Sequence, residues 1–247
     1  RRVLFRSKQL STTLKVRLIC DFFQNIIVTA FLPFIALYLT DMVNQHFAGL
    51  FLFALVMINF PISLISGHFI ERLPKKTLTL SYQLILSLML VVMAITISEQ
   101  AYMIILFCIA YAIFSITIGM QQPIMDTIIM DAITPEVEQY IYKISYWLTN
   151  IAVALGALIG GLMYGAHKSI LFFIAFAIYI MVFIALFIWL PNDLNQVNQS
   201  YTHHANEQQF SVGQILKSYK PAFKDTTYLL LIIGFSILTM GELRSEE

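Results

Sequence analysis

The sequence predicts an all-α membrane protein: a bundle of six helices followed by the start of a seventh. Three observations predict this fold. Hydrophobic residues make up 59% of the 247 residues and charged residues only 12%, about half the charged share that is usual in soluble domains. Six apolar runs follow one another, each of the roughly 20 residues that cross a bilayer as a helix. These runs are continuous rather than alternating, which disfavours a membrane β-barrel.

The expected spans and their connections set the domain organisation. The six spans are expected at 17–40, 46–70, 77–98, 101–120, 140–164 and 169–190. Most connections are short, so consecutive helices are expected to be antiparallel neighbours. Residues 8–190 therefore form the predicted bundle. Residues 191–226 begin with a run rich in Asn, Gln and Ser, which predicts a flexible linker, and residues 227–243 predict the start of a seventh span.

The two ends of the chain are expected to be artefacts. Residues 4–7, LFRS, can be encoded by CTC TTC CGA TCT, and the reverse complement of that string encodes RSEE, the last four residues. Such an inverted repeat is typical of sequencing-adapter DNA translated at both ends of a fragment. Segments 1–7 and 244–247 are therefore left out of the fold prediction, and the natural protein is expected to continue beyond both.

Charge predicts the orientation of the bundle. Four of the 15 Lys and Arg residues lie in the suspect ends. With the N-terminus in the cytoplasm, Lys168 alone of the other eleven falls on the outer side, which is a strong positive-inside bias. The linker is then cytoplasmic too. A net charge of +1 gives no reason to expect nucleic acid as a partner, and the two cysteines, in apolar runs, predict neither a disulfide nor a metal site.

The segment GHFIERLPKKTLTL, residues 67–80, connects the second and third spans. It resembles the loop motif of the major facilitator superfamily, G-x-x-x-D-R-x-G-R-K. The residues that match are Gly67, Arg72, Lys75 and Lys76, while Glu71 keeps the charge of the family's Asp and Pro74 replaces its Gly. The resemblance implies a gating loop. A plain positive-inside loop, in which Glu71 is incidental, is the alternative.

The fifth span carries the segment NIAVALGALIGGLMYG, residues 150–165. Gly156, Gly160 and Gly161 resemble the core of the superfamily's antiporter motif, although Ala157 replaces its Pro. Ala152, Gly156 and Gly160 are four residues apart, and such a stripe of small residues lets two helices pack closely. The resemblance implies efflux; generic helix packing is the alternative.

Polar residues inside spans suggest function because they are costly in lipid. Asp21 is the candidate for proton coupling, since burial favours the protonated form of a carboxyl group. Its alternative role is a structural partner for Arg17 or Lys143. Asp131 is expected to pair with Arg72 and so tie the fourth span to the loop. The candidates for lining a cavity, or else for bonding helix to helix, are Asn25, Asn59 and Asn150.

The resemblance as a whole implies the N-terminal half and central loop of a twelve-helix major facilitator transporter. We expect a secondary transporter of a bacterial plasma membrane that exports a small organic solute, coupled to protons, by alternating access. Solute uptake by symport is the alternative, and an integral-membrane enzyme or a non-transporting scaffold is the alternative of another class. The expected partners are the solute, protons, the lipid bilayer and the missing C-terminal half. We expect no enzyme activity, no cofactor and no metal, and the sequence contains no P-loop.

Overall fold

The structure is a computed structural model, and it describes residues 11–97, 103–165 and 168–191. Within these ranges the side chains at 64, 68–69, 71–72, 135–136 and 164 are not described. The described residues belong to one compact unit, residues 1–200, while a second unit, 201–247, lies outside the description. So do both suspected end segments, the start of the predicted seventh span and all but the first residue of the predicted linker.

Six long helices make up the described part of the chain, which contains no strand. Their bounds are α2 (Thr12–Met42), α3 (Gln45–Arg72), α4 (Lys75–Thr96), α5 (Met103–Ala132), α6 (Pro135–Tyr164) and α7 (Lys168–Trp189). Each is long and apolar enough to cross a membrane. The prediction of an all-α fold with six spans is therefore confirmed.

The largest difference from the expected spans is at the end of α5. The sequence predicts an end near residue 120 followed by a connection, but the helix continues through Pro123 to Ala132. Only residues 133–134 separate α5 from α6, which begins at Pro135 rather than at residue 140. Pro123 has no backbone N–H to donate within the helix. Residues 121–132 and 135–139, which the sequence assigned to the connection, are thus part of the helices.

Local sequence explains where several helices begin. The Ser11 hydroxyl accepts a hydrogen bond from the Leu14 N–H at 3.3 Å and caps α2. The Asn44 side chain does the same for the Phe47 N–H at the start of α3, at 2.8 Å. Such caps satisfy N–H groups that have no partner inside the helix. Pro74 and Pro135 stand at the first turns of α4 and α6, where a missing N–H costs nothing.

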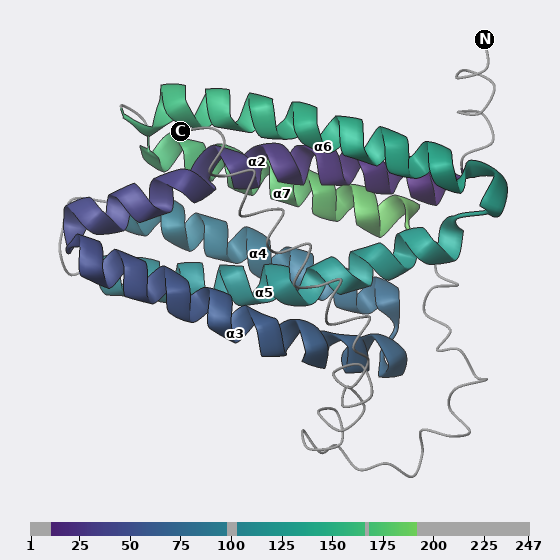
Figure 1. Cartoon of the computed structure of the whole chain (residues 1–247), viewed down its shortest axis with the longest axis horizontal. Coiled ribbons are helices and arrows are strands. Elements are labelled where there is room, and N and C mark those ends of the chain that lie inside the picture. Colours follow the sequence, from purple (N-terminus) through teal and green to yellow (C-terminus); the bar gives the residue numbers. More distant parts are fainter. Residues whose placement is uncertain (1–10, 98–102, 166–167, 192–247) are drawn as a thin grey trace, which may run out of the picture. The chain divides into compact units, whose positions relative to one another are not determined.

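The helices pack around an apolar core that lies between α2, α4, α5 and α7 (Figure 1). α2 lies along α6 and also contacts α3 and α7, while α4 packs against α5 and α7, and α3 packs against α5. Aromatic rings fill the middle: Phe31 of α2 meets Phe114 of α5 and Phe172 of α7 at centroid distances of 5.5 and 5.2 Å. Edge and tilted contacts of this kind add to the stabilisation from buried area.

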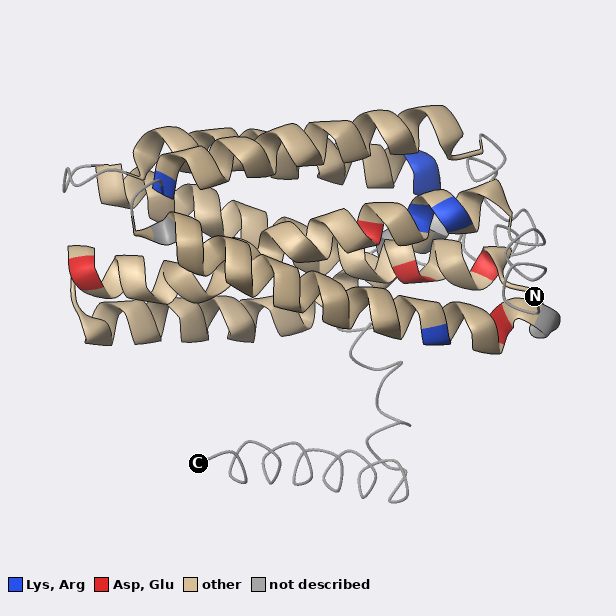
Figure 2. Cartoon of the chain, turned by 90° about the horizontal axis from the view of Figure 1, so that it is seen from above, with Lys and Arg blue, Asp and Glu red and all other residues tan. Residues whose placement is uncertain are grey.

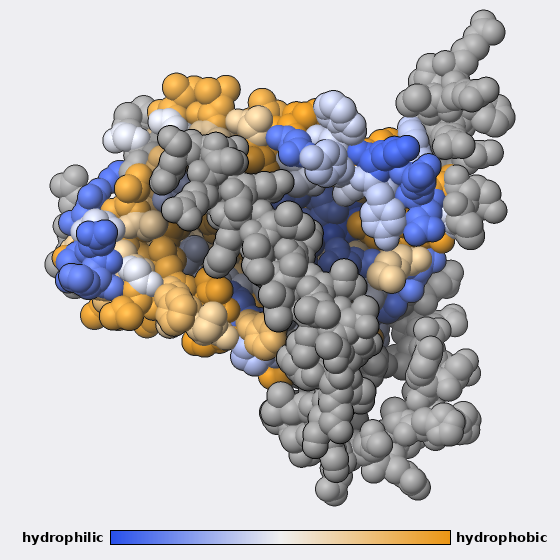
Figure 3. Space-filling view, viewed as in Figure 1, coloured by the Kyte–Doolittle hydropathy of each residue, from blue (hydrophilic) through white to orange (hydrophobic). Residues whose placement is uncertain are grey.

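Charge is concentrated at one end of the bundle (Figure 2). We call it the charged end; it is the end where α3 passes to α4 and α5 to α6. The described charged residues toward it are Lys15, Arg17, Asp21, Lys75, Lys76, Asp126, Asp131, Glu138 and Lys143. Asp41 and Lys168 lie at the opposite end. Hydrophobic side chains cover much of the flank between the two ends (Figure 3), as expected of a surface that faces lipid.

A buried lysine joins two helices at the charged end. Lys76, near the start of α4, is 9% exposed, and its Nζ donates to the carbonyl oxygen of Leu190 at 2.6 Å. The same ammonium group lies 5.9 Å from the centre of the Phe187 ring, a favourable arrangement for a cation and a π-system. Because carbonyl groups at the end of a helix lack partners within it, Lys76 fastens the end of α7 to the start of α4.

Candidate functional site

A buried arginine lies close to the charged end of α2. Arg17 is 2% exposed and about one and a half turns from the start of the helix. Its guanidinium group forms an ion pair with the Asp21 carboxylate, one turn further along α2. The Asp21 side chain is 26% exposed. The pair therefore joins a buried cation to a carboxylate that the surroundings can reach, and without that partner the cation would be costly to bury.

A second carboxylate, Asp126 of α5, also interacts electrostatically with Arg17. Asp126 is exposed, and its Oδ1 accepts a hydrogen bond of 3.4 Å from Gln122. The Arg17 Nε atom is buried and has no hydrogen-bond partner among the described residues. Arg17 thus has unused donor capacity beside one carboxylate of its own helix, and its charge also acts on a carboxylate of α5. We call Arg17, Asp21 and Asp126 the charge cluster.

Three glutamines form a second polar group, deeper in the bundle. The Gln83 Oε1 of α4 accepts hydrogen bonds from Gln24 of α2 at 3.0 Å and from Gln121 of α5 at 2.8 Å. The Gln83 Nε2 donates to the Tyr179 carbonyl of α7 at 3.1 Å. Gln83 is fully buried and Gln121 nearly so. One amide therefore connects four helices, in a region where few water molecules compete for it.

The three predicted cavity asparagines occupy different settings. Asn59 of α3 donates to the Ser115 hydroxyl of α5 at 2.9 Å, and so bonds helix to helix. Asn25 donates to the Asp21 carbonyl at 2.9 Å, and Asn150 to the Tyr146 carbonyl at 2.8 Å, each within its own helix. Asn150 is exposed. Within the described residues none of these amides bonds to another, and their role in lining a cavity stays a prediction.

The small residues of the fifth span lie against the first. A Cβ atom built on Gly156 would stand 2.4 Å from the Ile26 carbonyl oxygen, and one on Gly160 would stand 2.1 Å from that of Ala30. Both distances are far below van der Waals contact, so only glycine fits at either position. Gly161 has open space around its Cα and is exposed. Two of the three motif glycines thus bring α6 and α2 together, while the third faces outward.

The loop motif is only partly described. Gly67 lies in α3 with open space beside it, and the side chains of Glu71 and Arg72 lie outside the described residues. The Asp131 carboxylate is paired with Lys75, at 2.5 Å from its Nζ. The ion pair of Lys75 with Asp131 thus links the end of α5 to the loop motif. The predicted contact of Asp131 with Arg72 stays a prediction.

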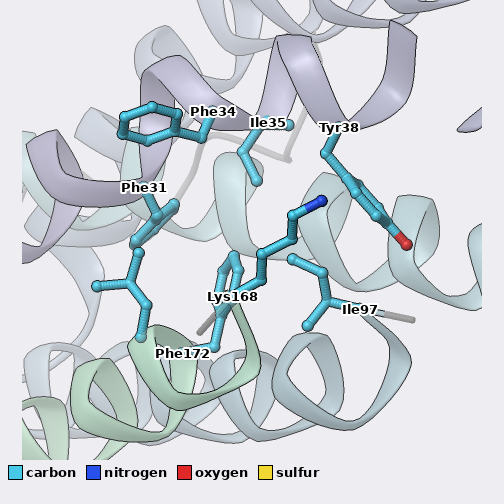
Figure 4. Close-up of a pocket in the computed structure, with 8 residues that line it drawn as sticks. Phe31, Phe34, Ile35, Tyr38, Ile97, Lys168 and Phe172 are labelled. Atoms are coloured by element: carbon cyan, nitrogen blue, oxygen red, sulfur yellow. The ribbon is translucent and has the colours of Figure 1, made fainter. Parts of the chain in front are cut away.

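A small pocket lies toward the end opposite the charged one, between α2 and α7 (Figure 4). The space inside it is about 10 Å³, which is room for about one water molecule. Apart from Lys168, its lining is apolar or aromatic, with Phe31, Phe34 and Phe172 among the lining residues. The Lys168 Nζ lies 5.8 Å from the centre of the Tyr38 ring. The lining offers one cation and an apolar wall, but no convergent set of polar groups.

Sequence reasoning missed three residues of these polar groups: Gln83, Gln121 and Asp126. Asp126 falls in the segment that the sequence assigned to a connection, so it was not considered as part of a span. Gln83 could have been found, because it is a lone amide within the expected span 77–98 and intramembrane polar residues are costly.

Comparison with known proteins decides the family. The family model described as the Major Facilitator Superfamily matches residues 17–243, which is most of the chain. The chain belongs to the Major Facilitator Superfamily. It is therefore a multi-pass membrane protein of a transporter family, as the loop and helix-five motifs implied.

One relative is the "Na(+), Li(+), K(+)/H(+) antiporter" of Planococcus maritimus, which is 22% identical over 229 residues. The match covers 92% of this chain and 54% of the relative. The chain thus spans about half the length of this relative.

Proposed function

We propose that the complete protein is a secondary transporter that exports a small organic solute across the plasma membrane in exchange for protons. Two helical halves would alternate between inward- and outward-open arrangements around a shared binding site. The bundle described above would be one of those halves, with its N-terminus in the cytoplasm. The described Lys and Arg residues lie toward the charged end, with the exception of Lys168, and this bias supports the orientation.

The observation that carries the proposal is the ion pair of Arg17 with Asp21. A buried cation paired with a partly exposed carboxylate responds to protonation, because a proton on Asp21 removes the partner of Arg17. The buried charge must then find another partner or shift with its helix. Proton binding is thereby linked to the packing of α2, which is the coupling that a proton-driven transporter needs.

The contact between α2 and α6 supports efflux rather than uptake. It is made at Gly156 and Gly160, the two glycines that resemble the superfamily's antiporter motif. Glycine at both positions lets the two helices pack backbone to backbone, and such an interface tolerates little change in spacing. We infer that α2 and α6 move as one unit and that Arg17 and Asp21 move with them.

A second candidate function is exchange of monovalent metal cations for protons. The name of the Planococcus maritimus relative favours it. The same coupling through Asp21 applies to both candidates, and the transported species distinguishes them.

The test is transport by the complete protein in liposomes. An imposed pH gradient, acidic inside, would energise uptake in inside-out-oriented protein, and a pH-sensitive dye would report proton release on adding each substrate. A panel of lipophilic organic cations tests the first candidate, and NaCl, LiCl and KCl test the second, with choline chloride as the control. If neither the organic cations nor the metal salts cause proton movement, proton-coupled export is refuted. Uptake that dissipates no pH gradient would refute the coupling alone.

A further inference from the structure

We propose that Gln24 and Gln121 present a pair of amide oxygens to an N–H group of the exported solute, and that the buried Gln83 holds both amides in that orientation. The solute is then an amine that carries a positive charge and at least one N–H. This inference rests on the proposed export of an organic solute and names the group by which the solute is recognised. It uses no residue of the charge cluster.

The backbone of α7 decides how the three amides are turned. The Gln83 Nε2 donates to the Tyr179 carbonyl oxygen at 3.1 Å. A carbonyl oxygen can only accept, so the nitrogen end of Gln83 must face α7 and its oxygen end must face away from it. The two ends of an amide have nearly the same shape, but here the backbone partner distinguishes them.

The orientation of Gln83 determines that of the other two amides. Its Oε1 accepts from the Nε2 of Gln24 at 3.0 Å and from the Nε2 of Gln121 at 2.8 Å. Both nitrogens are therefore turned toward Gln83, and both carbonyl oxygens are turned away from it. Because the two nitrogens share one acceptor, the two amides are neighbours. α2 and α5 thus hold two amide oxygens near each other.

Both oxygens are available to a ligand. In the described part of the chain neither accepts a hydrogen bond, and neither is among the fully buried polar atoms that lack a partner. Gln83 is fully buried, Gln121 is 5% exposed and Gln24 is partly exposed, so the amides lead from the core to the surface between α2 and α5. Figure 3 shows hydrophilic residues in a hollow of that surface. An unpaired acceptor is costly against lipid, so this surface faces water or a ligand.

The chemistry of the pair selects the ligand. Each amide nitrogen is held by Gln83, so the groups left for a ligand are acceptors, and an amide oxygen cannot donate to a carboxylate or a phosphate. A protonated amine matches the pair because it carries N–H donors, and its charge strengthens the hydrogen bonds. A quaternary ammonium ion has the same charge but no N–H. The site therefore distinguishes the two ions by hydrogen bonding.

Gln83 acts as a positioning residue, because it is fully buried and does not reach the ligand. Without it, Gln24 and Gln121 lose the acceptor that fixes them, and either end of each amide can turn toward the ligand. The preference for N–H donors should then fall although both glutamines remain. A residue that only supports the fold would instead weaken the binding of all ligands alike.

The test compares two ligands that differ by one methyl group. N,N-dimethyl-2-phenylethylamine keeps one N–H when protonated, and its N,N,N-trimethyl analogue has none. Isothermal titration calorimetry measures the dissociation constant of each for the complete protein in detergent. We expect the dimethyl compound to bind about tenfold more tightly, which is the effect of one hydrogen bond to a charged group. Gln24→Leu, Gln121→Leu and Gln83→Leu should each abolish the difference. Gln139→Leu, at an exposed position of α6, should keep it.

The variant Gln83→Glu separates positioning from folding. Its protonated carboxyl group offers a carbonyl acceptor and a hydroxyl donor in place of those of the amide. This variant should therefore keep the preference that Gln83→Leu loses. Thermal unfolding of each variant, followed by fluorescence, checks the fold as well.

Four results would overturn the inference: equal binding of the two compounds by the unmodified protein, binding of neither, a preference that survives Gln24→Leu, or displacement of the dimethyl compound by NaCl but not by choline chloride. The last result would assign the oxygens to a metal ion. Selective binding without proton-coupled transport in liposomes would refute the proposed function but not the site. Proton-coupled export of both compounds with equal Michaelis constants would refute the site but leave the proposed function standing.

Discussion

The Gly160 Cα of α6 lies so close to α2 that a Cβ atom added to it would stand 2.1 Å from the Ala30 carbonyl oxygen. The neighbour is backbone, which cannot rotate away as a side chain can. The two helices can lie this close at Gly160 because glycine has no Cβ atom.

The first prediction concerns this contact. Gly160→Ala should force α6 and α2 apart and lower the free energy of unfolding by about 1–3 kcal/mol, the usual cost of overpacking. Gly161→Ala is the matched control, because the adjacent glycine has open space around it. There alanine should be neutral, or stabilising by about 0.5–1 kcal/mol through its higher helix propensity. Thermal unfolding of both variants in detergent measures the difference, and equal midpoints would contradict the packing.

The second prediction concerns the buried glutamine. Gln83→Leu keeps most of the volume of the side chain but removes the acceptor of Gln24 and Gln121 and the donor to Tyr179. Leaving these polar groups unpaired should cost about 1–3 kcal/mol. Gln139→Leu, at an exposed position of α6, should cost much less. Chemical or thermal unfolding compares the two, and a Gln83→Leu protein as stable as the unmodified one would show that the network contributes nothing.

The third prediction concerns the buried ion pair. Asp21→Asn should destabilise the bundle more than the double variant Arg17→Gln/Asp21→Asn does, because the single change leaves a buried cation with only Asp126 to balance it. Proton-coupled transport should be lost in both variants. The order of the two unfolding midpoints is the measurement. A double variant that is less stable than Asp21→Asn would mean that Arg17 is held by other contacts.

The fourth prediction concerns the tie between α5 and the loop. Lys75 and Asp131 form a pair whose side chains are 19% and 47% exposed, so it should contribute no more than about 1 kcal/mol to stability. Its effect should be on transport. Lys75→Glu should slow export, and Lys75→Glu/Asp131→Lys should restore part of the rate by re-forming the pair. Initial rates of export in liposomes test this. A double variant that is slower than both Lys75→Glu and Asp131→Lys would argue against direct pairing.

Arg72 gives a separate prediction for the same loop. Arg72→Ala should lower transport if the guanidinium group bridges carboxylates at the charged end. The Lys75–Asp131 pair remains in this variant, so loss of rate would assign a distinct role to Arg72. Unchanged transport together with unchanged thermal stability would show that Arg72 has no role in gating.

The sequence predicted the spans well because lipid imposes a simple rule on length and polarity. The same rule failed at the end of α5. The run from Gln121 to Pro123 contains two amides and a proline, which is typical of a helix end in a soluble protein. Within a bundle, however, Gln121 bonds to Gln83, and tertiary contacts carry the helix on to Ala132. The interaction of Arg17 with Asp126 depends on this extension, so Asp126 could not be found from the pattern of spans.

The glycine motif was easier to interpret, because spacing alone places Gly156 and Gly160 on one face. Which helix they meet depends on the arrangement of all six helices, and no local pattern contains that information. The same holds for Asp131. Its position near the loop was expected, whereas its contact with Lys75 depends on side-chain geometry that the sequence does not specify.

The hydrogen bond from Lys76 to the Leu190 carbonyl also affects how the end of α7 responds to a pulling force. Residue 191 is the last described residue after α7, and it directly follows the carbonyl that Lys76 holds. A pull on the chain beyond that point is therefore borne by the base of α4 as well as by α7. Lys76 thus anchors the end of α7 on α4, so tension applied there would tilt the two helices together instead of unwinding the last turn of α7.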